Sequence, residues 1–437
     1  METPVINVGI MTQKEISFLF NAEYVHVETG TFIQGAKQAT WMNGKIIYGG
    51  KHYDELFFEP TSPEASFDLP AVTIGIDFHW QREETQRFKG ALELLATADG
   101  ILVINQVNAE EYLTSVISSE MNANASKEFL KAHAVISRSW LLAQSEKKFS
   151  PYRLVPYRNS FQDEHTLIRW YDREDHELFD VCADDHCQRY QGITRASNPT
   201  VHEAIEETRG EVLTHKGLIC DTRFSKCCGG MTERFENCWE SIPHPYLTGL
   251  RDDENTTDLP DLTDEREAER WIRTSPTAFC NTNDKAILSQ VLNNYDQETT
   301  DFYRWHVSYK QEELADLIHH KTGMDFGQIL DLIPIERGSS GRIVRLKIVG
   351  TLLTFTIGKE LEIRRTLSES HLYSSAFVVD KEDIREGIPQ LFRLTGAGWG
   401  HGVGLCQIGA AVMGAKGYTY QQILSHYFPG STIEKRY

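Results

Sequence analysis

The sequence lacks several features that would assign it to a common functional class. Its 437 residues carry a net charge of −19, so the basic surface typical of nucleic-acid-binding proteins is missing overall. No apolar run reaches the roughly 20 residues of a membrane-spanning helix, and the start resembles no export signal. We therefore expect no nucleic-acid partner and no membrane span. We also expect a cytoplasmic location, or the cell envelope if an export signal has been removed.

Cysteine is scarce outside one region. The chain has eight cysteines, and six of them fall between residues 182 and 238. A chain of this length is not a small disulfide scaffold, and the CxxC spacing of zinc fingers is absent. Local metal binding or buried thiols are the better interpretations, with one local disulfide as the alternative.

Short β-like runs and helical patterns follow one another without a regular alternation, which predicts an α+β fold. The sequence shows no internal repeat and no low-complexity tract. The expected parts are a β-rich N-terminal region over 1–105, a first part of the core over 106–250, an acidic and helical insertion over 251–335, and a second part of the core over 336–437.

Four segments have the spacing and end signals of helices. Residues 108–121 begin with Asn108, and Glu111 follows three residues later, which is close to a capping box. Residues 126–148 carry apolar side chains at helical spacing, residues 310–323 end in glycine, and residues 419–428 are followed by proline. A Cys-rich segment over about 200–240 is expected to be β-like, and strands are expected again over 341–358.

Two charged residues lie on the apolar faces of the first two helices. Glu120 follows Val116 and Ile117 by three or four residues. Burial raises the pKa of a carboxyl, as a general acid requires; a capping or salt-bridged structural Glu is the alternative. Arg138 lies on the second helix, where it either pairs with a carboxylate, with Glu120 as one candidate, or holds an anionic ligand.

Nitrogen and sulfur ligands gather in "HELFDVCADDHCQRYQG". His176, Cys182, His186 and Cys187 lie within twelve residues, and a histidine with two thiolates makes a three-ligand zinc set. A buried thiol pair or a Cys182–Cys187 disulfide fits the same spacing.

Two further stretches are unusual in composition. In "CCGGMTE", Cys228 precedes two glycines, and with His401 as base it would make a cysteine nucleophile. In "GAGWGHGVGLCQIGA", glycine occupies every second position from Gly396 to Gly404. Glycine weakens a strand and brings no side chain to pack. Either a ligand therefore comes close to this backbone, or the chain bends sharply there.

Taken in order, these segments resemble the SpoIID/LytB family, which includes the stage II sporulation protein D and the amidase-enhancer proteins. The resemblance spans about residue 85 to the C-terminus. It implies a peptidoglycan lytic transglycosylase that cuts glycan strands stripped of their stem peptides, while other members are enhancers of an amidase. It rests on "NAEEYLTSVISSEMN", "LKAHAVISRSW", "DDHCQRYQG", "TRGEVLTHKG", "CCGGMTE", "SGRIVRLKIVG", "LYSSAF" and the glycine run.

The resemblance also implies roles for single residues. Glu120 takes the position of the family's catalytic glutamate, and Arg138 that of its helix arginine. His176, Cys182 and Cys187 would hold zinc, as a histidine and two cysteines do in some members. This chain departs from many relatives in reading Cys-Cys-Gly-Gly where they read Ser-Ser-Gly-Gly, and "GLCQ" where they read "GMSQ".

A glycan substrate would give the glycine run a purpose, because exposed backbone lets sugar rings lie close. Trp399 would stack on a sugar face, His401 and Gln407 would bond hydroxyl or acetamido groups, and Cys228 would belong to the same substrate-binding set. The expected partners are peptidoglycan glycan strands or muropeptides, together with an amidase.

A lytic transglycosylase needs one catalytic carboxyl instead of the usual glycosidase pair, because the muramic acid C6 hydroxyl itself attacks C1. Glu120 would protonate the leaving oxygen of the MurNAc–GlcNAc bond and then accept the C6 hydroxyl proton, which leaves a 1,6-anhydro product. One alternative is a non-catalytic glycan-binding enhancer of a peptidoglycan amidase. The other is a cysteine hydrolase that uses Cys228 and His401.

Overall fold

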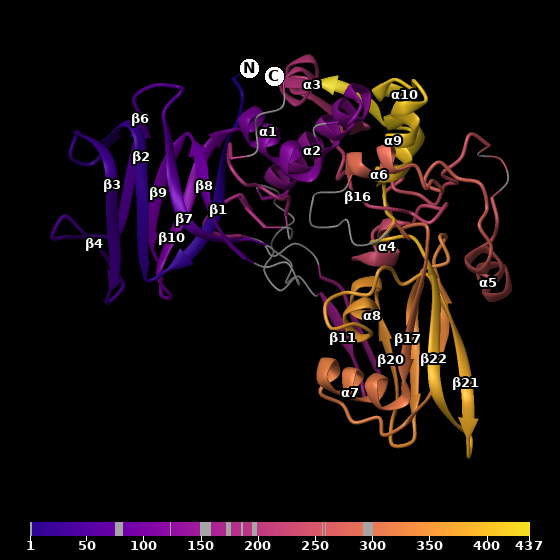
Figure 1. The fold of residues 1–437 in the computed structure, drawn as a ribbon. Coiled ribbons are helices and arrows are strands. Elements are labelled where there is room, and N and C mark those ends of the chain that lie inside the picture. Colours follow the sequence, from indigo (N-terminus) through magenta and orange to yellow (C-terminus); the bar gives the residue numbers. More distant parts are fainter. Residues whose placement is uncertain are drawn as a thin grey trace.

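The computed structural model describes residues 2–74, 82–122, 124–148, 159–171, 176–184, 187–194, 199–255, 257, 259–291 and 300–437. Within these residues strands outnumber helices, and a central group of helices lies between two β-rich parts (Figure 1). The predicted α+β class is confirmed. None of the helices in these residues combines the length and apolar composition needed to cross a membrane.

The N-terminal residues form one large sheet because their strands alternate buried and exposed side chains. In β2 (Glu15–His26), Ile16, Phe18 and Phe20 are buried, and the residues between them are exposed. The strand order is β13-β1-β10-β9-β6-β2-β3-β4-β5, with β7 paired to β2 and β8. The bounds are β1 (Val5–Gln13), β3 (Thr31–Met42), β4 (Lys45–Tyr48), β5 (Lys51–Tyr53), β6 (Glu55–Pro60), β7 (Ser66–Ile74), β8 (Arg82–Lys89), β9 (Ala91–Ala96), β10 (Ile101–Asn108) and β13 (Val181–Cys182).

The central helices begin where the large sheet ends. α1 (Ala109–Glu120) starts at Asn108, whose side chain accepts a hydrogen bond from the Glu111 N–H at 2.9 Å, as the sequence predicts. α2 (Lys127–Lys148) contacts α1, α3 (Pro199–Glu207), α9 (Gln407–Ala415) and α10 (Tyr420–Tyr427). A small sheet of β15 (Leu218–Ile219), β14 (Glu211–His215) and β24 (Thr432–Lys435) packs on α2 and brings the C-terminus close to the N-terminus (Figure 1).

The third part has its own hydrophobic core, which includes Leu314, Ile348 and Phe392. One of its sheets has the order β11-β12-β20-β19-β18, and the other has the order β17-β22-β21. Because β18 pairs with β19, the predicted boundary at residue 335 falls inside a strand and is not a structural boundary. The bounds are β11 (Ser160–Gln162), β12 (Thr166–Arg169), β17 (Arg304–Lys310), α7 (Gln311–Thr322), β18 (Ile329–Arg337), β19 (Ile343–Gly350), β20 (Thr354–Gly358), α8 (Glu360–Thr366), β21 (Phe377–Arg385) and β22 (Ile388–Ala397).

Short elements connect these parts. The acidic stretch that was expected to be helical contains α5 (Glu265–Arg273) and α6 (Lys285–Val291), whereas α4 (Phe235–Cys238), β16 (Phe224–Ser225) and β23 (Leu405–Cys406) belong to the centre. The Cys-rich segment begins with α3 and not with a strand. Its Val201, Ala204 and Ile205 recur at helical spacing and are buried, and Pro199 suits the first helical turn.

Candidate functional site

The predicted acid lies at the end of α1. Glu120 is the last residue of that helix, and the chain leaves the helix at Met121. Tyr112, Val116 and Ile117 on the same helix are fully buried, whereas Glu120 is half-buried. The carboxyl therefore lies at the border between the core and solvent. In this position it is partly removed from water and can still contact a substrate.

The phenol of Tyr112 links Glu120 to the predicted zinc ligands. Burial raises the pKa of Tyr112 well above its usual value, and the nearby groups of Cys187, Cys182 and Glu120 raise that pKa further. The neutral hydroxyl donates to Oε1 of Gln188 at 3.4 Å. The predicted acid and two predicted metal ligands therefore act electrostatically on the same buried phenol.

The three predicted ligands converge as a metal site requires. One ligand atom from each of His176, Cys182 and Cys187 lies within 4.8 Å of the others, and Nε2 of His176 lies 3.5 Å from Sγ of Cys187. Cys182 and Cys187, both described, are not joined by a disulfide, and the Cys182 N–H donates to Sγ of Cys187 at 3.4 Å. This nitrogen and sulfur set fits one zinc ion. His186 lies outside the described residues.

β13 explains how this ligand set is held. It lies parallel to β1 at the edge of the large sheet, with Cys182 opposite Gly9. A Cβ at Gly9 would lie 2.7 Å from the ring of Phe179, so glycine is required there for close packing. The Phe179 ring in turn stacks on His176 at 4.4 Å between centroids.

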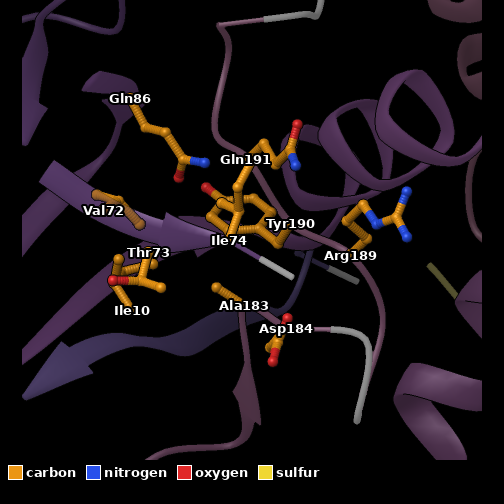
Figure 2. Close-up of a pocket in the computed structure, with 10 residues that line it drawn as sticks. All are labelled: Ile10, Val72, Thr73, Ile74, Gln86, Ala183, Asp184, Arg189, Tyr190 and Gln191. Carbon is orange, nitrogen blue, oxygen red and sulfur yellow. The ribbon is translucent and has the colours of Figure 1, made fainter. Parts of the chain in front are cut away.

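A small cavity next to this segment is too small for a sugar. It lies between the large sheet and residues 183–184 and 189–191, and Gln86, Tyr190 and Gln191 line it (Figure 2). Its volume is about 20 Å³, which is enough for one water molecule. The amide of Gln86 is buried and makes no hydrogen bond within the described residues. We conclude that this cavity is not the glycan site.

A larger cavity, of about 490 Å³, opens at the other end of α1 and is lined by Glu110, Glu111, His202, Glu206 and Arg209. Glu110 and Glu120 are ten residues apart on the same helix, which is about 15 Å along its axis. The carboxyl pair of an ordinary glycosidase is separated by at most about 9.5 Å. The two carboxyls therefore do not form such a pair.

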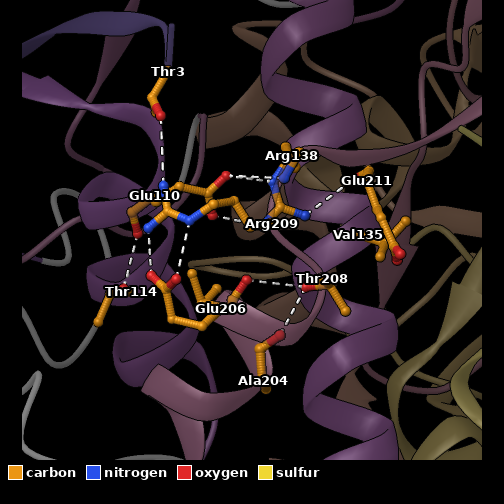
Figure 3. Close-up of polar contacts among 12 residues, drawn as sticks. Thr3, Glu110, Thr114, Val135, Arg138, Ala204, Glu206, Thr208, Arg209 and Glu211 are labelled. Carbon is orange, nitrogen blue, oxygen red and sulfur yellow. Dashed lines mark hydrogen bonds and ion pairs between the residues drawn. The ribbon is translucent and has the colours of Figure 1, made fainter. Parts of the chain in front are cut away.

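Arg138 is engaged by Glu110 and not by Glu120, which corrects the candidate pairing from the sequence (Figure 3). Its Nε and Nη2 donate to the two oxygens of Glu110 at 3.0 and 2.7 Å, and Nη1 donates to the Glu211 carbonyl at 3.0 Å. Arg138 is 0% exposed and Glu110 3%. Arg138 thus has no surface to offer a glycan, and its role here is to hold the helices together.

The glycine run bends and packs against the protein itself. Gly398, Gly400, Gly402 and Gly404 all have φ between 72° and 89°, which favours glycine. A Cβ at Gly402 would lie 2.4 Å from Nη1 of Arg342, and one at Gly404 would lie 2.1 Å from the Arg223 carbonyl oxygen. The space that was expected to receive sugar rings is thus filled by this chain, which favours the sharp structural bend.

Arg342 is a residue that the sequence analysis missed. It is buried, and its guanidinium donates to the carbonyl oxygens of Gly400, Cys228 and Cys227 and to Oγ of Ser340. No local pattern in the sequence could reveal this role, because the carbonyl groups belong to segments far away along the chain. Among the glycines of the run, Gly402 is the one whose missing side chain leaves room for this guanidinium.

Trp399 and His401 are half-buried within aromatic contacts. Trp399 stacks on Tyr373 with centroids 4.2 Å apart, and His401 packs edge-on against Trp239 at 4.8 Å. Burial first, and then the charges of neighbouring arginines, hold the pKa of His401 well below its usual value, so its ring is neutral. Nδ1 accepts the Val403 N–H at 3.0 Å.

Gln407 and Cys228 are not at the surface. Gln407 is 2% exposed, and its amide nitrogen lies 3.2 Å from Nε2 of His133, so the predicted contact with glycan is not available. Cys228 is 2% exposed, and burial raises the pKa of its thiol well above the usual value. Its Sγ lies 3.6 Å from Sγ of Cys280, while the thiol of Cys238 donates to the backbone carbonyl of His401 at 3.7 Å. The structure therefore does not support the cysteine hydrolase.

Comparison with known proteins agrees with the resemblance in the sequence. The family model of the stage II sporulation protein, SpoIID, matches residues 97–215, and that of a domain of unknown function, DUF8618, matches residues 233–404. The SpoIID match contains α1 and α2 together with the segment that carries the three predicted zinc ligands.

Several curated proteins match most of the chain. An uncharacterised protein of Brachyspira hyodysenteriae is 26% identical over 79% of this chain and 72% of its own length. The amidase enhancer of Bacillus subtilis is 26% identical over 74% of this chain but only 40% of its own length. The stage II sporulation protein D of Bacillus amyloliquefaciens is 24% identical over 76% of both chains. Together with the SpoIID match, these similarities bear out the resemblance to the SpoIID/LytB family: residues 97–215 match its family model, and most of the chain is similar to stage II sporulation protein D and the amidase enhancer.

Proposed function

We propose that the protein is a lytic transglycosylase that cuts the MurNAc–GlcNAc bond of peptidoglycan strands, with Glu120 as its single acid and base. The observation that carries this proposal is the half-buried position of Glu120 at the end of α1, around the same phenol as Cys182 and Cys187. The long separation of Glu120 from Glu110 along the helix supports a mechanism with one carboxyl.

In this mechanism Glu120 protonates the leaving glycosidic oxygen, and its carboxylate then accepts the proton of the C6 hydroxyl that attacks C1. The bond to the leaving sugar breaks, a bond from O6 to C1 forms, and the product is a 1,6-anhydro sugar. In the first step the carboxyl of Glu120 donates its proton, and its half-buried position leaves it accessible to a substrate. No water is consumed, so a second carboxyl to activate water is unnecessary.

A zinc ion held by His176, Cys182 and Cys187 would fix residues 176–184 and 187–191 against α1 and place positive charge near the Tyr112 phenol. Gln188 and Gln191 already connect this segment to α1 through the Tyr112 hydroxyl and Oγ of Ser115. We therefore assign the metal a positioning role. The proposed substrates of the protein are glycan strands or muropeptides. The reaction would therefore take place either in the cell envelope or on wall fragments taken up by the cell.

The test is the Glu120→Gln variant, which keeps the shape of the side chain but has no proton to donate to the leaving oxygen. General acid–base catalysis contributes about 10²- to 10⁴-fold, and we expect a loss near the upper end, with glycan binding retained. The assay measures 1,6-anhydromuramic ends by mass spectrometry, from denuded and from peptide-bearing strands. Glu111→Gln, near the other end of α1, is the matched control and should cut normally.

Two results would count against this assignment. Near-normal release of anhydro ends by Glu120→Gln would remove Glu120 from the acid role. Binding of denuded strands without any cutting by the wild type would favour the amidase enhancer, which is the printed name of one relative. In that case a stimulated partner amidase becomes the activity to measure.

A further inference from the structure

Four buried ligands that the proposed reaction does not use meet in the core of the protein. Cys228, Asp252, Cys280 and Cys406 come from four separate segments, and one ligand atom of each lies within 4.8 Å of all the others. From this convergence we propose that the protein binds a second, structural zinc ion through these four side chains.

The spacing of the sulfur atoms suits a single tetrahedral ion. Zinc–sulfur bonds of about 2.3 Å in a tetrahedron place sulfurs about 3.8 Å apart. The Sγ atoms of Cys228 and Cys280 lie 3.6 Å apart, whereas a disulfide bond would bring them to about 2 Å. Cys227 contacts Cys280 and Cys406 but does not belong to the mutually close set of four.

The carboxylate of Asp252 calls for a cation. It is 0% exposed, and its oxygens accept hydrogen bonds from the Cys280 N–H at 3.0 Å and the Tyr427 hydroxyl at 2.6 Å. Within the described residues no lysine or arginine lies within ion-pair distance of it, and Nε2 of His426 is 3.8 Å away. Burying a carboxylate without a counter-charge is costly, and a divalent ion supplies that charge. The Tyr427 hydroxyl would orient the Asp252 carboxylate through its hydrogen bond, as groups that are bonded to metal ligands commonly do.

The surroundings of Cys406 favour a negatively charged sulfur. The Cys228 N–H donates to its Sγ at 3.2 Å, and such bonds stabilise a thiolate ligand. Cys406 is also the N-cap residue of the nine-residue α9, where the helix dipole favours negative charge. Both features act on the same sulfur atom that the ion would bind.

The ligand types select zinc over other common ions. Calcium and magnesium prefer oxygen ligands, whereas thiolates suit zinc. Binding releases one proton from each of the three thiols to solvent and involves no oxidation or reduction. With four protein ligands the site is closed, as structural zinc sites are. The ion would tie residues 228, 252 and 280 to the start of α9.

The test is the zinc content of the full chain, purified under reducing conditions, measured together with X-ray absorption at the zinc edge. Cys182→Ser isolates the buried site, because it removes a ligand of the other set only. We expect this variant to keep one zinc per chain, with a first shell dominated by sulfur at about 2.3 Å. Cys280→Ser should hold one zinc fewer than the wild type.

Cys220→Ser is the matched control, because Cys220 is buried but outside both ligand sets, and its zinc content should equal that of the wild type. The proposal is overturned if Cys182→Ser contains no zinc, if its zinc is surrounded mainly by nitrogen and oxygen, or if Cys280→Ser keeps the full content. Should Cys280→Ser fail to fold, the absorption spectrum of Cys182→Ser still decides. A Cys228–Cys280 disulfide in zinc-free protein would also overturn it.

Discussion

Replacing Arg138 by methionine tests whether this residue serves the fold or the substrate. The change removes three donors at once and leaves the Glu110 carboxylate buried, with the Gly210 N–H at 3.4 Å and the Tyr437 hydroxyl at 2.6 Å as its remaining hydrogen-bond donors. Breaking a buried ion pair by removing one partner costs about 3–5 kcal/mol. We expect the free energy of unfolding of Arg138→Met to fall by that amount, measured as the shift of the urea unfolding transition.

The double variant Glu110→Gln/Arg138→Met separates the stranded charge from the lost packing. It buries no charge, and its amide oxygen can still accept from Tyr437, so it should be about 1–4 kcal/mol more stable than Arg138→Met alone. If Arg138→Met unfolds within about 0.5 kcal/mol of the wild type but no longer binds denuded strands, the reasoning is refuted, and Arg138 contacts the substrate in a conformation different from this one.

Two further variants probe the packing around the glycine run. Gly402→Ala should lower the free energy of unfolding by about 2–4 kcal/mol, because the backbone is left-handed and a side chain would displace Arg342. Gly417→Ala, where the space is open, should lower it only by the backbone contribution. Equal losses of stability in the two variants would contradict this account. The pKa of His133 is lowered to about 3, by burial first and Lys226 second. The unfolded chain takes up this proton near its ordinary pKa of about 6.5, so stability should be lost as the pH falls from about 6.5 towards 3, by about 1.4 kcal/mol per unit. His133→Gln should flatten that slope in urea titrations between about pH 7 and pH 5; parallel slopes would contradict it.

Local signals in the sequence were sufficient for the four helices that it predicts by their ends, although α3 was missed. Asn108 caps α1, Gly323 ends α7 with φ 71°, and Thr419 forms a capping box at the start of α10, all where the sequence predicts helix ends. These signals work because each depends on residues within one turn of the helix end. The ligand set of His176, Cys182 and Cys187 was found for the same reason, since all three lie in one short segment.

Contacts between distant segments could not be predicted. Arg138 finds its carboxylate 28 residues earlier in the chain, on α1, and one apolar helix face offers both Glu110 and Glu120 as candidates. The alternation of glycines left a close ligand and a sharp bend open and was assigned to glycan binding; at Gly402 the group that comes close is Arg342, 60 residues earlier in this chain. Periodicity shows that a backbone is crowded without showing what crowds it.

The exposure of the predicted site residues changes the place where the proposed substrate is expected to bind. Arg138, Gln407 and Cys228 are closed off from solvent and bonded within the protein, so none of them can meet a polymer in this conformation. Glu120 and the ligand set are half-buried instead, and Glu120, Cys182 and Cys187 all raise the pKa of Tyr112. A glycan strand that reaches the carboxyl of Glu120 would therefore meet the end of α1, where that carboxyl is half-buried.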